Sequence, residues 1–538
     1  MKKNIFLFVL ILNSLFFFSC SKKPTNYFRT VTIDSKSGIK GRYPLDDNFA
    51  LTTKCYHFKY DDNGKVVLVE YLENGKAKLD PISKVSKIKI EYSKGIEKRT
   101  YLNTNDEPML DTLSGVYSNR IILDENDFRK SLFNYDLDGN IIEDKFGVAQ
   151  YYWTLDKSGQ RIKSIRLDKN GNRTTNIYGL HEIRMKYDGI GNLIEQSYYD
   201  IEGHPINNKL SGVAIERSKY DSDGNIIETR YYGINEKLKL GKPYDAAIIR
   251  RKYDDKGNNI ETSFYGTSET LKLNSQSGFA IIRSKHDDKG NVIEESYYDI
   301  DGQLKGNIQD GIPMVRWKYD DRGNVIEQCY YSIDGRLKGN LKFGIPMIRW
   351  KYDNKDNLIE KSFYGINSQL VNEKESGVAI KRFKYDDNGN QIERSYYGTD
   401  GQLKGDLESE IPMVRWKYDD KGNQIEKSIY GVTGQLINDK MFGVPTFRAK
   451  YDDKGNKIET TYYDSSGQQV NDKMFGVAIV RNKYDDKGNQ IETSFYGMDG
   501  QLNNSPRFGV AIIRSRYDEN NKVYRTFINK EGKIIKQE

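Results

Sequence analysis

Hydrophobic and polar side chains alternate with a period of two in short runs along most of this chain. In one copy the runs cover residues 311–319 and 324–331, and a four-residue loop containing Asp and Gly joins them. Two alternating runs joined in this way predict a β-hairpin. A Tyr-Asp pair, once replaced by His-Asp, ends the first run and returns every 33 residues from Tyr187 to Tyr517. Such a fixed period predicts one supersecondary unit stacked many times.

The fourth loop position predicts a left-handed backbone. Gly occupies it in most copies, as at Gly323, and glycine adopts positive φ without strain. Where Gly is missing, the position holds Asp356 or Asn521, the residue types that tolerate positive φ best. The substitutions therefore support a hairpin loop at this point of every copy.

A loop that closes Tyr319 on Asn324 places Arg316 opposite Glu327 within one hairpin. Arg recurs three residues before the Tyr, and Glu recurs eight residues after it. One sheet face should therefore carry a ladder of Arg–Glu pairs, with Lys318 and its equivalents beside it, that fixes the strand register. The representative ladder residues are Arg316, Glu327, Arg349, Glu360, Arg415 and Glu426.

The opposite face is apolar and needs cover. In the same copy it carries Val315, Trp317, Tyr319, Ile326 and Tyr330. A lone hairpin is marginal in water, so neighbouring copies are expected to supply the stability. An Asp-Gly turn follows the hairpin, and residues 336–338 predict a short third strand.

These patterns predict an all-β fold, an elongated or superhelical antiparallel sheet of about fifteen β-hairpin repeats of 31–33 residues. Copies near the N-terminus are less regular, with spacings of 31 or 32 residues. The expected parts are a signal peptide (1–19), a lipidated cysteine with a tether (20–26), an N-terminal cap (27–55), irregular repeats (56–180), regular repeats (181–516), and a truncated repeat with a C-terminal cap (517–538).

The N-terminus has the pattern of an export signal. Two lysines precede a nearly unbroken apolar run at residues 5–18, which is too short to span a bilayer comfortably. Ser19-Cys20 follows, and this resembles the site at which bacterial lipoproteins are cleaved and lipidated. The resemblance implies a lipid on Cys20 that holds the chain in the cell envelope, at the outer membrane or the cell surface. An ordinary secretory signal that ends near a cysteine is the alternative.

The composition and motifs of the chain disfavour several classes of partner and activity. The chain has 84 Lys and Arg against 77 Asp and Glu, and the excess is spread evenly. Nucleic acid usually requires a concentrated basic stripe, so we expect no nucleic-acid partner. The three cysteines form no CxxC motif and suggest no metal site. The sequence also contains no HExxH, P-loop or GxSxG motif. We therefore expect no enzyme activity, no cofactor and no metal.

The motif Tyr-Asp-Asp-Lys-Gly-Asn, at residues 418–423 and 33 and 66 residues later, resembles the YD repeats of the Rhs family. That resemblance implies β-hairpin arrays that build curling sheets or hollow shells. This chain has a longer period, and it lacks a recognisable toxin region, so toxin delivery is not implied. A weaker similarity, at residues 297–306, is to choline- and glucan-binding repeats.

Two sets of aromatic residues are candidates for ligand binding. A Tyr at one repeat position, on the Arg–Glu face, would stack on sugar rings or would stiffen the sheet by cross-strand packing. A Trp accompanies Ile-Pro-Met at the start of three strands and would line a groove or pack in the core. The candidates are Tyr298, Tyr331, Tyr364, Tyr397, Trp317, Trp350 and Trp416.

The uniform array predicts a long surface rather than a single active site. We therefore expect a non-enzymatic, lipid-anchored envelope protein that binds, adheres or forms a scaffold through its repeated β-surface. Its ligand would be a protein or a glycan. The alternatives are glycan binding through the Tyr ladder and an Rhs-like shell or scaffold around a cargo.

Overall fold

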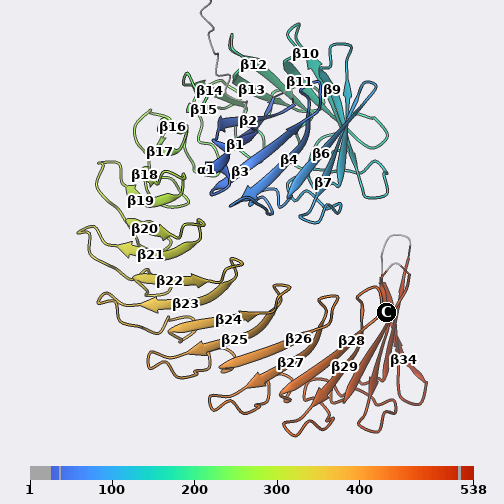
Figure 1. Cartoon of the computed structure of the whole chain (residues 1–538). Helices are drawn as coiled ribbons and strands as arrows, with labels where there is room; N and C mark the ends of the chain where they lie inside the picture. The colour runs from blue at the N-terminus through green and yellow to red at the C-terminus, as the bar shows by residue number, and fades with distance from the viewer. Residues whose placement is uncertain (1–25, 35–37, 487, 519–522) are drawn as a thin grey trace, which may run out of the picture. The chain divides into compact units, whose positions relative to one another are not determined.

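A computed structural model describes residues 26–34, 38–486, 488–518 and 523–538. These residues form two compact units, one ending at Lys209 and the other beginning at Leu210. Each unit consists of antiparallel β-strands, and the helix α1 (Asp47–Ala50) is the only helix within the described residues. The prediction of an all-β fold of repeated antiparallel hairpins is confirmed (Figure 1).

The first unit contains strands β1 to β13. Their bounds are β1 Tyr27–Asp34, β2 Gly38–Pro44, β3 Lys54–Tyr60, β4 Val66–Glu73, β5 Lys76–Ala77, β6 Lys87–Ser93, β7 Ile96–Leu102, β8 Ser118–Leu123, β9 Arg129–Tyr135, β10 Gln150–Leu155, β11 Arg161–Leu167, β12 Glu182–Tyr187 and β13 Leu193–Tyr199.

The second unit contains strands β14 to β34. Their bounds are β14 Ile215–Tyr220, β15 Ile226–Tyr232, β16 Ile248–Tyr253, β17 Asn259–Tyr265, β18 Ile281–His286, β19 Val292–Tyr298, β20 Met314–Tyr319, β21 Val325–Tyr331, β22 Met347–Tyr352, β23 Leu358–Tyr364, β24 Ile380–Tyr385, β25 Gln391–Tyr397, β26 Met413–Tyr418, β27 Gln424–Tyr430, β28 Thr446–Tyr451, β29 Lys457–Tyr463, β30 Ile479–Tyr484, β31 Gln490–Tyr496, β32 Ile512–Tyr517, β33 Val523–Ile528 and β34 Ile534–Gln537.

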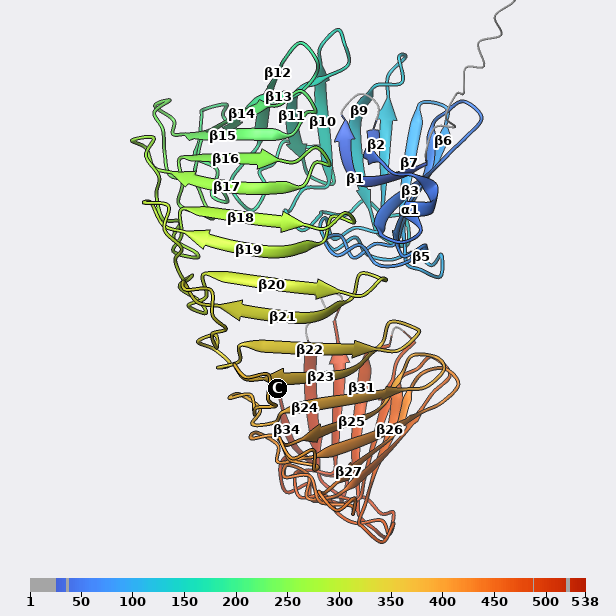
Figure 2. The same ribbon diagram turned by 60° about the vertical axis from the view of Figure 1, so that its left-hand side comes forward.

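Within the second unit, strands follow one another in chain order, each hydrogen-bonded to the next (Figures 1 and 2). The two strands of a hairpin, such as β20 and β21, pair along their full length. Successive hairpins pair through three residues on each strand, as β21 does with β22. The stack is therefore held by backbone hydrogen bonds between copies as well as within them.

The hairpin loop has the conformation that the sequence predicts. Asp320 N donates to the carbonyl of Asn324, and Gly323 has φ of 83°. Asp356, which replaces Gly in the next copy, has φ of 65°. Asn521, the other replacement, lies outside the described residues. Both described positions are left-handed, so the prediction is confirmed there.

The predicted pairing of Arg316 with Glu327 inside a hairpin is wrong. A β-bulge between Lys318 and Tyr319 shifts the register, so that Lys318 faces Glu327 and Arg316 faces Cys329. The loop also has five residues rather than four, because Tyr319 faces Val325, and within it Asp320 Oδ1 accepts the N–H of Asn324 at 2.8 Å.

The core of each repeat lies on the face opposite the charged residues. In one cluster Val315 and Tyr330 pack with Ile345, Ile348 and Phe363, all buried. Ile345 belongs to the connection between two hairpins, not to a strand, and is only 1 % exposed. The connection therefore folds back and covers the apolar face.

The predicted third strand at residues 336–338 is wrong. Only Leu337 bridges to Tyr331, and the segment continues as turns. Lys338 N donates to the Tyr330 carbonyl and Tyr330 N donates to the Pro346 carbonyl, both at 2.9 Å. The connection therefore supplies hydrogen-bond partners for both the N–H and the carbonyl of Tyr330 near the end of β21, without forming a further strand.

β1, near the N-terminal end of the described residues, lies beside β3, the first strand of the β3–β4 hairpin. β1 pairs with β2 and also with β3, through Tyr27 and Phe28. At the other end of the chain β34 pairs with β33.

None of the helices in the described part of the chain is long and apolar enough to cross a membrane. Cys20, the predicted lipidation site, lies outside the described residues.

Candidate binding surface

One face of the second unit carries a continuous charge ladder, which we define as nine Glu residues with the Lys and Arg that each one binds. Every Glu accepts through Oε1 from the Lys of its own hairpin and through Oε2 from the Arg of the next hairpin. The nine are Glu228, Glu261, Glu294, Glu327, Glu360, Glu393, Glu426, Glu459 and Glu492.

Glu327 shows the geometry of the ladder. Lys318 Nζ lies 2.7 Å from its Oε1, and Arg349 Nε lies 2.8 Å from its Oε2. Arg316 of the same hairpin binds Glu294 of the preceding hairpin at 2.6 Å. The predicted ladder therefore exists on the predicted face, but each Arg–Glu pair joins two hairpins. Arg349–Glu327, Arg382–Glu360 and Arg415–Glu393 follow the same rule.

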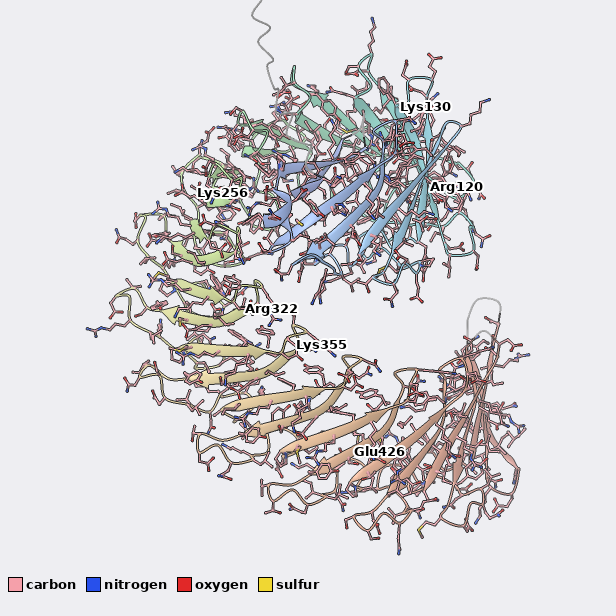
Figure 3. All side chains as sticks on the ribbon, viewed as in Figure 1. Arg120, Lys130, Lys256, Arg322, Lys355 and Glu426 are labelled. Atoms are coloured by element: carbon pink, nitrogen blue, oxygen red, sulfur yellow. The ribbon has the colours of Figure 1, made fainter. Side chains whose placement is uncertain are left out.

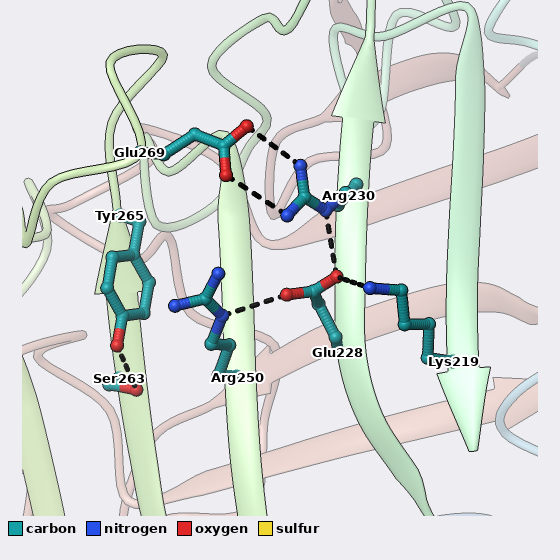
Figure 4. Close-up of polar contacts among 7 residues, drawn as sticks. All are labelled: Lys219, Glu228, Arg230, Arg250, Ser263, Tyr265 and Glu269. Carbon is teal, nitrogen blue, oxygen red and sulfur yellow. Dashed lines mark hydrogen bonds and ion pairs between the residues drawn. The ribbon is translucent and has the colours of Figure 1, made fainter.

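The first ladder position has additional contacts (Figure 4). Glu228 binds Lys219 and Arg250, as elsewhere, and also accepts from Arg230 Nε at 2.8 Å. Arg230 in turn donates to both carboxylate oxygens of Glu269, at 2.9 and 3.1 Å. Arg230 occupies a position that is mostly Ser in other copies, so this Glu has three cations where its equivalents have two.

These contacts keep the ladder carboxylates ionised. Burial alone would raise the pKa of Glu228, but hydrogen bonds from Arg230, Arg250 and Lys219 outweigh it and lower the pKa from 4.5 to about 2. The pKa of Glu327 is also below its ordinary value, because the bonds from Lys318 and Arg349 outweigh the opposing effect of burial. The ladder is therefore fully charged at neutral pH.

The ladder presents cations outward and hides its carboxylates. Ladder Glu side chains are 9–15 % exposed, whereas the Lys side chains are 65–72 % exposed. Arg side chains of the ladder are 41–59 % exposed. One Lys and one Arg meet one Glu in each repeat, so each hairpin adds one uncompensated positive charge to this face.

The hairpin tips form a second row of charges with a different balance. Lys256 Nζ lies 2.7 Å from Asp288 of the next tip, and Lys355 Nζ lies 3.2 Å from Asp387. Lys256, Arg322 and Lys355 are labelled at these tips in Figure 3. Asp288 and Asp387 are almost fully exposed. Both signs of charge reach solvent at the tips, unlike on the ladder face.

The candidate tyrosines lie on the ladder face, as predicted. An Arg guanidinium lies over each ring, with Cζ 4.6 to 4.8 Å from the centroid. The tyrosines covered in this way are Tyr298, Tyr331, Tyr364 and Tyr397. Arg283, for example, covers Tyr298, whose hydroxyl donates to Ser296 Oγ at 3.3 Å. One face of each ring is therefore used inside the protein.

The candidate tryptophans lie on the opposite face. Trp317 and Trp350 pack against the cluster that contains Ile312 and Ile345, and Trp416 packs against the one that contains Ile411. Each of these Ile residues immediately precedes the Pro of the Ile-Pro-Met motif. This arrangement explains the coupling of Trp to that motif as core packing. Trp317 and Tyr331, one member of each set, nevertheless line one common depression.

A depression of about 900 Å³ lies along the ladder between two successive hairpins. Its lining includes Lys285, Glu294, Arg316, Glu327 and Tyr331. The sequence prediction included Arg316, Glu327 and Tyr331 but placed no binding role on Lys285 and its equivalents. Their fixed position, one residue before each Tyr or His, is the signal that was available in the sequence.

Asp200, Glu202 and His204 form a group of possible metal ligands within the described part of the chain. Their ligand atoms all lie within 4.8 Å of one another, and Glu202 and His204 are exposed. The N–H of His204 donates to Asp200 Oδ1 at 2.7 Å, so the Asp already closes a turn. Exposed acidic turns of this kind are common without a metal, and we assign none.

No family model matches the chain, and no curated protein matches it. Among solved structures, the crystal structure of TcdB2-TccC3-TEV is 11% identical, with a TM-score of 0.28 over 88% of this chain and 26% of that chain. TcdB2-TccC3 without its hypervariable C-terminal region is 12% identical, with a TM-score of 0.27 over 89% of this chain and 26% of that one. A Photorhabdus luminescens Tc holotoxin pore is 11% identical, with a TM-score of 0.26 over 90% and 26%. The chain thus spans about a quarter of these structures, and we base no functional argument on them.

Proposed function

We propose that this chain is a non-enzymatic repeat scaffold whose charge ladder binds an extended anionic polymer, with an acidic polysaccharide as the partner class. The observation that supports this proposal is the imbalance of exposed charge on the ladder face. Lys318 is 71 % exposed, whereas the carboxylate that it binds, Glu327, is 12 % exposed. A partner that approaches the ladder meets its ammonium and guanidinium groups before it meets the ladder carboxylates.

The spacing of the surplus charges suits a linear partner. Two strands per hairpin at about 4.8 Å per strand set the positive charges roughly 10 Å apart along the stack. Each contact is weak because it is exposed to solvent and salt. Many such contacts on one polymer reinforce one another, since the second and later contacts form at high effective concentration. The length of the array therefore determines the affinity.

Stacking of a neutral sugar on the Tyr ladder has less support. Arg316 lies over Tyr331, so one ring face is unavailable for a sugar. The same contact holds the guanidinium in place beside Glu294. We propose that the tyrosines position the Arg side chains that face the polymer.

Anchoring in the cell envelope is part of the same proposal. The apolar run at residues 5–18, followed by Ser19-Cys20, supports export and lipidation. A lipid would hold the array at a membrane surface. There a multivalent site would retain an acidic polymer close to the membrane. Mass spectrometry of the mature N-terminus tests this part independently of binding.

Binding to dextran sulfate, with neutral dextran of equal length as the comparison, tests the proposal on the full chain. The ladder variant changes five exposed lysines to Gln, and these are Lys318, Lys351, Lys384, Lys417 and Lys450. The tip variant makes the same five-charge change at Lys256, Lys289, Lys355, Lys421 and Lys454.

The affinity of the ladder variant for dextran sulfate should be at least tenfold lower than that of the unmodified chain. Its binding should also depend less on salt, because fewer counterions are released. The affinity of the tip variant for dextran sulfate should fall less than threefold. Equal losses in the two variants would mean that only net charge matters, and the ladder would have no special role. Equal binding of neutral dextran by the unmodified chain would contradict the anionic partner.

An Rhs-like shell around a cargo remains a separate hypothesis, supported by the YD motif alone. It predicts that a second molecule copurifies with the chain. Small-angle scattering of the purified protein would distinguish a closed shell from an open array.

A further inference from the structure

On the face opposite the ladder, a cavity of about 340 Å³ opens between two hairpins of the second unit. It lies at the lower end of the roughly 300–1,000 Å³ that small-molecule sites usually occupy. Six residues define its walls: Phe442, Phe447, Ala449, Thr460, Tyr462 and Phe475. Two of these, Phe442 and Phe475, come from connections between hairpins, and the others come from β28 and β29.

Local sequence explains why the cavity exists. The position two residues before the repeat Tyr holds Trp350, Phe383 and Trp416 in the three preceding hairpins but Ala449 here. The residue across the strand pair is also smaller, because Thr460 faces Ala449 where Lys427 faces Trp416. The smaller pair leaves open a space that Trp416 and Lys427 occupy at the same position of the preceding hairpin.

The walls of the cavity are aromatic. The Phe442 ring packs edge-on against Phe447, with centroids 5.1 Å apart and planes at 85°. It is nearly parallel to Tyr462 at 6.1 Å, and it lies 6.3 Å from Phe475. Rings arranged in this way offer both faces and edges to a flat guest.

Two cations line the same cavity. Lys427 and Lys457 belong to its lining, and Lys427 Nζ lies 5.4 Å from the centroid of Phe447. No ion pair engages either lysine among the residues that the structure describes. Glu426 and Arg448, which also contribute to the lining, bind each other on the ladder face at 2.8 Å. The cavity thus combines an apolar interior with uncompensated positive charge.

We propose that this cavity is a binding site for a small aromatic anion, a flat ring system of one or two rings that bears a carboxylate or sulfonate. The ring enters between Phe442, Phe447 and Tyr462, and the acid group faces Lys427 and Lys457. The site does not depend on the function proposed for the ladder, although two ladder residues, Glu426 and Arg448, contribute to its lining.

Calorimetric titration of the full chain with 2-naphthoate tests the site, with the neutral 2-naphthylmethanol as the comparison. Ala449→Trp should reduce naphthoate affinity at least tenfold, because it restores the ring that the preceding hairpins carry. Ser284→Trp introduces the same ring at the same repeat position in another hairpin and should leave the affinity unchanged. Circular dichroism and the thermal midpoint check that both variants fold.

Lys427→Gln combined with Lys457→Gln keeps the cavity open and tests the charge separately. This double variant should bind naphthoate about tenfold or more weakly, with an affinity equal to that for the neutral alcohol. Its affinity for the alcohol should be unchanged. The proposal is overturned if the unmodified chain fails to bind naphthoate at millimolar concentration, or if Ala449→Trp binds it as well as Ser284→Trp does. Equal affinity of the unmodified chain for the alcohol and the acid would overturn the anionic specificity.

Discussion

Glu327 Oε2 accepts a hydrogen bond from Arg349 Nε at 2.8 Å, and these two residues belong to different hairpins. They face each other directly in the pairing of β21 with β22. Glu327 also binds Lys318 of its own hairpin. One carboxylate therefore connects the strand pair inside a repeat to the next repeat, and the same arrangement returns along the second unit.

Replacing Glu327 by Gln should loosen the junction between β21 and β22. The change removes the carboxylate between Lys318 and Arg349 and should cost about 1 kcal/mol, since both cations are partly exposed and screened by solvent. Hydrogen exchange of the β21 and β22 amides measures this local cost. Asp453→Asn, at a fully exposed tip contact with Lys421, is the matched control and should change nothing measurable. An equal effect of the two variants would remove the special role of the ladder.

The ladder should make stability fall in acid. The folded pKa of Glu228 is lowered from 4.5 to about 2, so its stabilising effect is complete above pH 4.5 and is lost as the pH falls toward 2. Glu228→Gln should therefore be less stable than the unmodified chain at pH 7, and the difference should shrink below pH 4.5. Thermal midpoints of both chains between pH 7 and pH 2 measure it. A difference that stays constant down to pH 2 would contradict the pKa shift.

The connection between hairpins should behave as part of the core. Ile345 lies in a connection and is 1 % exposed, so Ile345→Ala should cost about 2–4 kcal/mol through lost burial and the cavity that remains. Ile333 also lies in a connection but is 66 % exposed, and Ile333→Ala should have little effect. Hydrogen exchange of β20 to β23 compares the two. Similar small effects would mean that the connections are loosely attached loops.

The sequence predicted the hairpins well because their pattern is local. Alternation of side chains, the loop Gly and its replacement by Asp356 all lie within a few residues of each turn. It also placed Arg316, Glu327 and Tyr331 on one face, since alternation fixes which residues share a face. The predicted fold depended only on such short-range signals, and it is confirmed.

The register was beyond the sequence pattern. Counting from Tyr319 to Asn324 gives one pairing, and a five-residue loop followed by a β-bulge gives another. The longer loop and the bulge together move the pairing by two residues, which leaves each ladder side chain on its predicted face, so the partner of Glu327 could not be chosen from spacing alone. The cavity near Ala449 did leave a mark in the sequence, because a run of aromatic residues at that repeat position ends at Trp416.

The register of the ladder is the claim on which the exposed charge of this face depends, and disulfide formation tests it most directly. With all three native cysteines replaced by Ser, the pair Glu327→Cys and Arg349→Cys places two thiols on directly opposed residues of β21 and β22. The pair Arg316→Cys and Glu327→Cys places them diagonally within one hairpin, roughly 7–8 Å apart. Mild oxidation should close the first pair and leave the second reduced. Closure of the second pair, with the first remaining reduced, would contradict the account.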